Sequence, residues 1–314
     1  MHLIITHILP PKNIANEIAN ILPEKAPNLF KLIQSYNVNV SHLDLNYLSC
    51  TALESVILEL NGYKSNNKFR IGQWLGQMNI KNYIYDINMN PIWLIELVNL
   101  DFINGNIRLY TADDLNIQKE ESQILFDSSQ HIFNHYGFKV FFENKNFWVI
   151  SLPKNFHPKL CMSPQLAKNY FINNIFDITP YNNIWRILLN NIQIHWTSHK
   201  INNNRFKKYL LPINSIWLYG GCIPDKIKKT YDQNILIIKD LDKYYKNNDW
   251  NMWLNALTEI DNKYIYKYIN NTCVTDNLIL LGHDYRVDFK LNNHKNIFQK
   301  ILYKNWRYWW NQEI

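Results

Sequence analysis

Apolar positions at the start of the chain predict a strand followed by two helices. The run from Leu3 to Leu9 is continuous, as in a buried strand, and Pro10 with Pro11 is expected to end it. Apolar residues then recur every three or four positions, which indicates a helix that Pro23 is expected to break. Pro27 favours the first turn of a second helix. The inward faces of these helices are expected to be Ile14, Ile18 and Ile21, then Leu29, Leu32 and Ile33.

The middle of the chain predicts paired strands around one long helix. No element is assigned to residues 41–86, where the pattern is irregular. Lys119 to Tyr136 keeps helical spacing, and Gly137 is a natural C-terminal stop. Two strand pairs are expected: 92–98 with 107–110 around a turn at 104–106, and 138–142 with 147–150 around residues 143–146.

The last third of the chain alternates helices and strands. Apolar residues from Ile184 to Trp196 keep helical spacing, and Ile213 to Leu218 is a strong strand that Gly220 and Gly221 are expected to close. Further elements are expected as a strand at 235–238, a helix at 250–257, a strand at 278–281 and a basic, aromatic helix at 297–310. This alternation predicts an α/β fold, with a mixed sheet flanked by helices.

Length and composition indicate a folded protein with a large core. The chain has 314 residues, of which 47% are hydrophobic and 19% charged. We expect a single α/β unit over residues 1–314, with a soft seam near residues 152–163 between an N-terminal and a C-terminal region. Eighteen consecutive apolar residues occur nowhere, and the N-terminus lacks the basic start of a signal peptide. The expectation is therefore a soluble, cytoplasmic protein without a membrane partner.

The net charge of +7 invites a nucleic-acid interpretation, but the positive charge is dispersed. The basic clusters at residues 205–208 and 226–229 are short and flanked by apolar residues, and the chain is rich in Asn, Ile and Lys throughout, as expected from an AT-rich genome. The tail at residues 304–310 mixes bases with tryptophans, which either stack on nucleobases or dock on the core. Nucleic acid is therefore an unlikely partner and is kept as an alternative.

Cysteine and histidine spacing does not indicate a metal site. The cysteines are scattered without a CxxC pair, which suggests neither a zinc knuckle nor a disulfide framework and favours mostly buried, reduced thiols: Cys50, Cys161, Cys222 and Cys273. His195 and His199 stand four apart and could share a helix face, but no third ligand is evident. His283 and Asp284 follow a predicted strand, where α/β proteins place their sites. A surface loop explains them equally well.

The densest group of polar residues lies between the helix at 184–196 and the end of the strand at 213–218. Glycines after a strand allow backbone N–H groups to approach a ligand, and Arg205 would supply a forked donor for phosphate or carboxylate. The alternative is that Arg205 and Asn214 simply tie the loop to the strand. The candidate anion-binding residues are His199, Asn202, Arg205, Asn214, Gly220 and Gly221.

The segments 188–193, 199–205 and 211–221 resemble the signature of the Rpf-type regulatory proteins of proteobacteria. They are also similar to the central H-P-x-N-x-x-R and P-x-N-x-x-W-x-W-G pattern of archaeal-type cofactor-independent phosphoglycerate mutases. Lys200 replaces the usual proline, and Tyr219 replaces the second tryptophan. The opening, with Ala26 to Leu29, resembles the T-P-N-L segment of alkaline-phosphatase-type folds. The resemblance implies an alkaline-phosphatase-like core.

Measured against the active members of these families, this sequence lacks the residues that would hold the catalytic metals. Active relatives hold two divalent ions through Asp and His side chains, and their first strand ends in an Asp-Gly motif. Here Thr6, His7 and Ile8 stand in that place, no D-x-x-x-H-D cluster occurs, and His283 with Asp284 reverses the late Asp-His motif. We expect a non-catalytic regulatory or binding protein on a degenerate scaffold, without metal or cofactor and with a phosphorylated small molecule as a possible ligand. The alternatives are an active Mn²⁺- or Mg²⁺-dependent mutase or phosphotransferase, and a nucleic-acid-binding factor.

Overall fold

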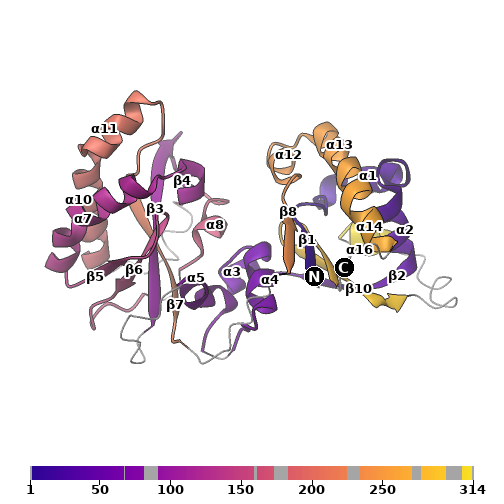
Figure 1. The fold of residues 1–314 in the computed structure, drawn as a ribbon, viewed down its shortest axis with the longest axis horizontal. Helices are drawn as coiled ribbons and strands as arrows, with labels where there is room; N and C mark the ends of the chain where they lie inside the picture. Colours follow the sequence, from indigo (N-terminus) through magenta and orange to yellow (C-terminus); the bar gives the residue numbers. More distant parts are fainter. Residues whose placement is uncertain are drawn as a thin grey trace. The chain divides into compact units, whose positions relative to one another are not determined.

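The computed structural model describes residues 2–66, 68–80, 91–158, 161–172, 183–224, 234–270, 277–294 and 306–312. The chain folds into two compact units. Unit 1 comprises residues 1–44 and 231–314, and unit 2 comprises residues 45–230 (Figure 1). The expected seam near residues 152–163 lies inside unit 2. The chain instead leaves unit 1 once and later returns to it.

Unit 1 is built on a mixed sheet in the strand order β2-β10-β9-β1-β8. The strands are β1 (His2–Ile5), β2 (Tyr36–His42), β8 (Ile235–Ile238), β9 (Asn277–Leu281) and β10 (Tyr285–His294). β1 runs parallel to both β8 and β9, whereas β10 pairs antiparallel with β9 and β2. Because β1 is flanked by parallel strands, its carboxyl end meets those of β8 and β9 at one edge of the sheet.

Helices pack against this sheet and complete the core of unit 1 (Figure 1). The helices of the described part are α1 (Lys12–Lys25), α2 (Pro27–Ser35), α12 (Asp242–Lys246), α13 (Trp250–Ile260), the π-helix η2 (Asp261–Ile265), α14 (Tyr266–Ile269) and α16 (Trp306–Trp310). The buried Asp261 carboxylate accepts the backbone N–H groups of Leu29 at 2.7 Å and Asn28 at 3.1 Å. It therefore caps the first turn of α2.

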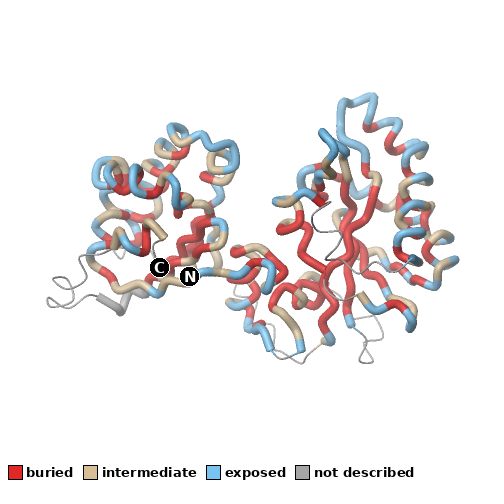
Figure 2. The backbone as a smooth tube through the Cα atoms, turned by 180° about the vertical axis from the view of Figure 1, so that it is seen from behind, coloured by how far each residue is buried: buried red, intermediate tan, exposed pale blue. Residues whose placement is uncertain are grey.

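Unit 2 is built on an antiparallel sheet organised around one long strand. The strands are β3 (Ile92–Ile103), β4 (Asn106–Tyr110), β5 (Lys139–Phe142), β6 (Phe147–Ser151) and β7 (Ser215–Cys222). The first half of β3 lies between β6 and β7, and its second half pairs with β4. The buried backbone of unit 2 follows these strands, and exposed positions gather on the outer helices (Figure 2).

Helices cover both faces of this second sheet (Figure 1). The helices are α3 (Leu45–Leu48), α4 (Ala52–Leu60), the 3-10 helix η1 (Ile71–Trp74), α5 (Leu75–Asn79), α6 (Ala112–Leu115), α7 (Lys119–His135), α8 (Pro164–Ala167), α10 (Asn183–Thr197) and α11 (Lys200–Lys207). Two sheets, each flanked by helices, confirm the predicted mixed α/β fold. In the described part of the chain, no helix is both long enough and apolar enough to cross a membrane.

Several predicted elements are confirmed because their signals are local. The turn between β3 and β4 places Asn104 and Gly105 at positive φ, as a tight hairpin requires, and Gly137 follows α7 at φ +78°. The strands at 147–151, 235–238 and 277–281 and the helices at 119–135, 183–197 and 250–260 also match. Cys50, Cys161 and Cys222 are free and buried, and Cys273 lies outside the described residues.

Other elements were predicted wrongly, were not predicted, or lie only partly within the described residues. β1 ends at Ile5 and not at Leu9, because the chain turns at His7, whose φ is +52°. Pro23 lies inside α1, where it removes a hydrogen bond only in the last turn. β2, β10 and the elements between residues 45 and 79 were not predicted. Of the expected helix at 297–310, residues 297–305 lie outside the described residues, and α16 covers 306–310.

Gly220 and Gly221 do not close β7 but lie within it, at a β-bulge. Trp93 pairs with Gly220 and Ile92 pairs with Cys222, so Gly221 is the extra residue. Both glycines have positive φ, at +92° and +93°. A Cβ added to Gly221 would lie 2.5 Å from the ring of Trp93. Glycine is therefore needed here for backbone conformation and for packing against the indole.

We expect Gly221→Ala to lower the free energy of unfolding by about 2–4 kcal/mol, since it adds a buried steric overlap to an unfavourable φ. Gly105→Ala is the matched control. Its φ is +80°, but a Cβ there meets no atom within 4 Å, so only the backbone cost of about 1 kcal/mol is expected. Urea denaturation of both variants gives the comparison, and equal losses would contradict the packing role of Gly221.

Candidate functional site

The candidate anion-binding residues do not form one site. His199 stands at the N-terminus of α11, Asn202 and Arg205 lie within it, and Asn214 directly precedes β7, whereas Gly220 and Gly221 lie near the other end of β7. His199 caps α11, because its Nδ1 accepts the backbone N–H of Ile201 at 3.2 Å. The structure thus brings together the polar residues of the motif and leaves out the glycines.

The two asparagines of the motif tie the start of β7 to its surroundings. The Asn202 amide donates to the carbonyl oxygens of Trp196 and Ile213, and its oxygen accepts the N–H of Ile213 at 2.8 Å. Asn214 exchanges two hydrogen bonds with the backbone of Leu100, at 2.8 and 3.0 Å. Both side chains therefore satisfy backbone groups where the regular pairing of β7 with β3 begins.

Arg205 lies on the buried side of α11, with only 1% of its surface exposed. Its Nε donates to the carbonyl oxygen of Leu211 at 2.7 Å, and its Nη2 donates to that of Leu115 at 2.6 Å. Nη1 donates to Glu121 Oε2 at 2.8 Å, which forms an ion pair with the first turn of α7. Each guanidinium nitrogen has a protein acceptor, so these contacts favour the interpretation in which Arg205 joins the loop to neighbouring elements.

The imidazoles of α10 and α11 do not form a metal site. The ring centroids of His195 and His199 lie 5.8 Å apart, as do those of His131 and His195. Within the described ranges, no three His, Cys, Asp or Glu side chains are arranged so that they could hold a metal ion. Burial lowers the pKa of His199, and the charges of His195 and Lys200 add to the effect. His199 thus favours its neutral, cap-accepting form.

A second polar group gathers at the carboxyl edge of the parallel strands in unit 1. Thr6 and His7 follow β1, Asp242 begins α12 shortly after β8, and His283 with Asp284 follows β9. Thr6 Oγ1 contacts Asp242 Oδ1 at 2.5 Å, and His7 Nδ1 contacts the same oxygen at 2.6 Å. Carboxyl ends of parallel strands are where α/β proteins bind ligands. We call these five residues the edge cluster.

Both carboxylates of the edge cluster, Asp242 and Asp284, lie close to histidine side chains. Burial opposes ionisation of Asp242, but hydrogen bonds from His7 and Thr6 outweigh it and hold the pKa of Asp242 below its ordinary value. Partial desolvation lowers the pKa of His283 despite the nearby Asp284 carboxylate. Asp284 lies 3.5 Å from His42 Nε2. The edge therefore offers an exposed imidazole beside carboxylates that already have protein partners.

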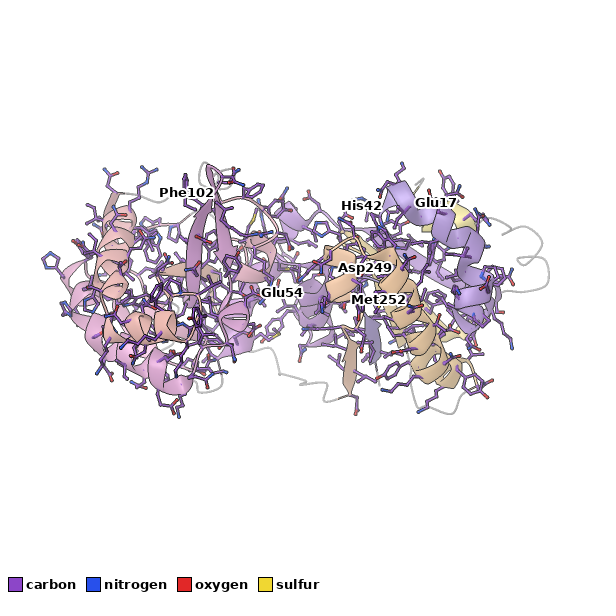
Figure 3. All side chains as sticks on the ribbon, turned by 90° about the horizontal axis from the view of Figure 1, so that it is seen from above. Glu17, His42, Glu54, Phe102, Asp249 and Met252 are labelled. Atoms are coloured by element: carbon purple, nitrogen blue, oxygen red, sulfur yellow. The ribbon has the colours of Figure 1, made fainter. Side chains whose placement is uncertain are left out.

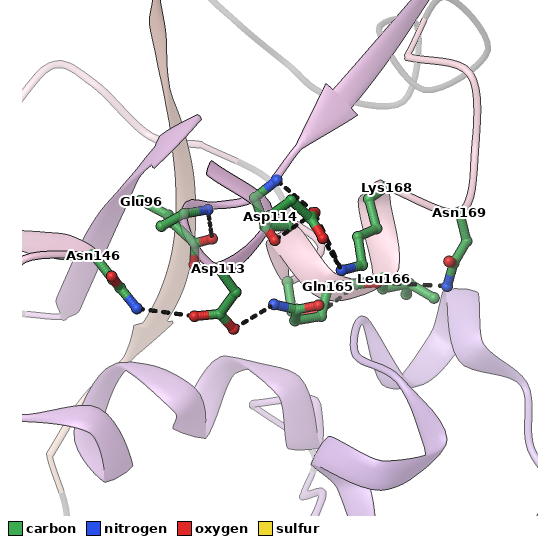
Figure 4. Close-up of polar contacts among 11 residues, drawn as sticks. Glu96, Asp113, Asp114, Asn146, Gln165, Leu166, Lys168 and Asn169 are labelled. Atoms are coloured by element: carbon green, nitrogen blue, oxygen red, sulfur yellow. Dashed lines mark hydrogen bonds and ion pairs between the residues drawn. The ribbon is translucent and has the colours of Figure 1, made fainter. Parts of the chain in front are cut away.

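A third polar group lies in unit 2, between β3, α6 and α8 (Figure 4). Asp113 accepts from the amides of Asn146 at 3.0 Å and Gln165 at 3.3 Å. Asp114 caps α6 through Thr111 and pairs with Lys168 at 3.3 Å. These contacts join the start of α6 to α8 and to the β5–β6 turn.

Glu96 is a buried carboxylate on β3 beside this group (Figure 4). Its Oε1 accepts the N–H of Ala112, at the first turn of α6, at 3.0 Å. Burial raises the pKa of Glu96 to about 8, and the charges of Asp113 and Glu54 add to the effect against the Ala112 hydrogen bond. A carboxyl group that is largely protonated near neutral pH can act as a hydrogen-bond donor or exchange a proton.

The raised pKa of Glu96 predicts a loss of stability as pH rises. The folded protein keeps the Glu96 proton that the unfolded chain releases near 4.5, so the free energy of unfolding falls between about pH 4.5 and 8. Glu96→Gln retains an acceptor for Ala112 and should remove this dependence, exceeding wild type by about 1–4 kcal/mol near pH 8. Urea denaturation across this range measures it, with exposed Glu120→Gln as control. A difference from wild type that stays constant with pH would contradict the assignment.

Sequence reasoning found some of these residues and missed others. His283 and Asp284 were singled out because they follow a strand. Asp242 was missed, although its position shortly after the predicted strand at 235–238 is the same signal. Glu96 was also missed, and the signal was a lone carboxylate within the apolar run of β3.

The aromatic tail packs on the core of unit 1. Trp309 and Trp310 are buried, and Trp310 Nε1 donates to the carbonyl oxygen of Ala15 at 3.0 Å. Trp306 packs edge-to-face on Phe30. These contacts favour the docking interpretation of the tail, because rings buried in the core are not available to stack on nucleobases.

Comparison with known proteins gives distant structural neighbours. No protein-family model matches the chain, and no curated protein matches it. The solved structures that resemble it include a cofactor-independent phosphoglycerate mutase from Thermoplasma acidophilum DSM 1728, with 10% identity, a TM-score of 0.35, and coverage of 96% of this chain and 94% of that one. The PH0037 protein from Pyrococcus horikoshii gives 10% identity, a TM-score of 0.42, and coverage of 96% and 91%. These values are too low to assign the chain to the family of either protein.

Proposed function

We propose that this protein is a non-catalytic binding protein whose small-molecule ligand lies at the edge cluster of unit 1. The observation that carries the proposal is the hydrogen bonding of Asp242, whose Oδ1 accepts from both Thr6 and His7. Asp242 Oδ1 is thereby engaged by protein donors, and no three His, Cys, Asp or Glu side chains of the described residues are placed to hold a metal ion. The edge keeps the position of an α/β ligand site, while its chemistry favours hydrogen bonding over metal catalysis.

The ligand class that we propose is a phosphorylated metabolite, which the resemblance to the Rpf-type and mutase families suggests. His283 is exposed at the end of β9. In its protonated form it would donate a charge-assisted hydrogen bond to a phosphate oxygen. Because desolvation lowers the pKa of His283, the protonated form and the binding of phosphate should increase as pH falls below the ordinary range of histidine.

Titration calorimetry with a panel of phosphorylated three-carbon acids and sugar phosphates tests the proposal. We expect at least one ligand to bind, with affinity that rises as pH falls and that drops about tenfold in His283→Ala, which removes a charged hydrogen bond. Folded Arg205→Lys protein is the control. Arg205 already bonds protein acceptors through all three of its guanidinium nitrogens, so this variant should bind the ligand with the affinity of wild type.

Two outcomes would contradict the proposal. One is the absence of binding by any member of the panel. The other is affinity that survives in His283→Ala but is lost in folded Arg205→Lys, which would place the ligand at the connection between α11 and β7.

A further inference from the structure

Unit 2 carries an exposed apolar surface at the end of β3 and α11. Every residue from Phe206 to Pro212 is exposed, with Phe206 83% and Tyr209 98% accessible. The end of β3 contributes Phe102, which is 71% exposed and labelled in Figure 3. We call the following residues the apolar tip: Phe102, Ile103, Phe206, Tyr209, Leu210 and Leu211. Clustered apolar exposure of this kind marks an interaction surface.

The two parts of the apolar tip are held together by hydrogen bonds. Asn99 Nδ2 donates to the carbonyl oxygen of Pro212 at 2.9 Å, and Asn214 bonds the backbone of Leu100. Arg205 Nε fixes the carbonyl of Leu211 from below. The segment that carries Leu210 and Leu211 therefore lies beside the strand that leads to Phe102. Hydrogen bonds from Asn99, Arg205 and Asn214 thus fix the backbone that carries the apolar tip.

Tyr209 is displayed at an energetic cost. It follows α11 in the left-handed conformation, at φ +56°, and its N–H donates to Phe206 O while Leu210 N–H donates to Arg205 O. This hydrogen-bond pattern is a Schellman motif, in which glycine usually occupies the left-handed position. A tyrosine there costs about 1 kcal/mol of backbone energy. Since its ring makes almost no intramolecular contact, the fold itself gains nothing from that cost.

The chain segment that carries Phe206 to Leu211 is basic. No acidic residue occurs between Asp177 and Asp225. The bases in that stretch are Arg186, Lys200, Arg205, Lys207 and Lys208. Lys207 and Lys208 are exposed and lie between the two exposed aromatic residues Phe206 and Tyr209. Arg205 is buried and paired with Glu121, so the exposed positive charge beside the apolar side chains comes from Lys207 and Lys208.

We propose that the apolar tip docks on an anionic lipid bilayer, with its aromatic and aliphatic side chains at the headgroup boundary and Lys207 and Lys208 on anionic headgroups. Aromatic rings with flanking lysines suit that boundary. Leu210, Leu211 and Ile103 distinguish a bilayer from a nucleic acid, because aliphatic side chains have no stacking role on bases. The expectation of no membrane partner rested on spanning segments, and docking at a surface requires none.

Co-sedimentation of the full chain with vesicles tests this proposal. The protein should bind vesicles of phosphatidylcholine with phosphatidylserine, and bind phosphatidylcholine alone far more weakly. Phe206→Ser combined with Tyr209→Ser should weaken binding by more than about tenfold. Lys207→Ala and Lys208→Ala should each weaken it about fivefold and reduce its salt dependence.

Matched controls lie in unit 1, where Tyr266 is 51% exposed and Lys31 is exposed. Tyr266→Ser and Lys31→Ala should leave vesicle binding unchanged, and all variants should keep the wild-type melting temperature. The proposal is overturned if no vesicle is bound or if the tip variants bind like wild type. If no vesicle is bound and the tip variants instead abolish self-association or binding to single-stranded RNA, the apolar tip is a surface for a second copy of the chain or for RNA, and the proposal is wrong.

Discussion

The hydrogen bonding of one carboxylate, Asp242, organises the carboxyl edge of the sheet in unit 1. Asp242 accepts from the Thr6 hydroxyl and from His7, and the backbone N–H of Thr6 donates to the carbonyl oxygen of Ile238. These bonds join the ends of β1 and β8 at the edge where an α/β sheet offers its ligand site. Because Asp242 Oδ1 already accepts from these strand ends, our proposal places ligand contact at the exposed His283.

In unit 2, too, the polar side chains of the candidate motif form hydrogen bonds with other parts of the protein. Arg205, the side chain best suited to an anion, bonds acceptors in the loop before β7, near the end of α6 and in α7. Gly221, which would allow a ligand near the backbone, is packed against Trp93. A sequence pattern that resembles a ligand-binding motif can therefore persist because it stabilises the connection between a helix and a strand.

The sequence predicted the elements whose signals are local and missed what depends on distant partners. Turn residues Asn104 and Gly105 and the apolar runs of β8 and β9 were sufficient for those elements. The division into units depends on β1 pairing with β8, far away along the chain, which periodicity does not encode. For the same reason the role of Arg205 was open, because its partner Glu121 lies 84 positions away. The polar strand end at residues 283–284 was recognised, whereas Asp242, which Thr6 contacts across 236 positions, was not.

The central claim is that the carboxyl edge of unit 1 binds ligand without catalytic metal ions. The most direct measurement is calorimetric titration of the purified protein with Mn²⁺, combined with an assay of 3-phosphoglycerate turnover in its presence. We predict that the protein shows no saturable Mn²⁺ binding that depends on Asp242, and no turnover of 3-phosphoglycerate. Stoichiometric binding of Mn²⁺ that is lost in Asp242→Asn, together with isomerisation of 3-phosphoglycerate, would contradict it.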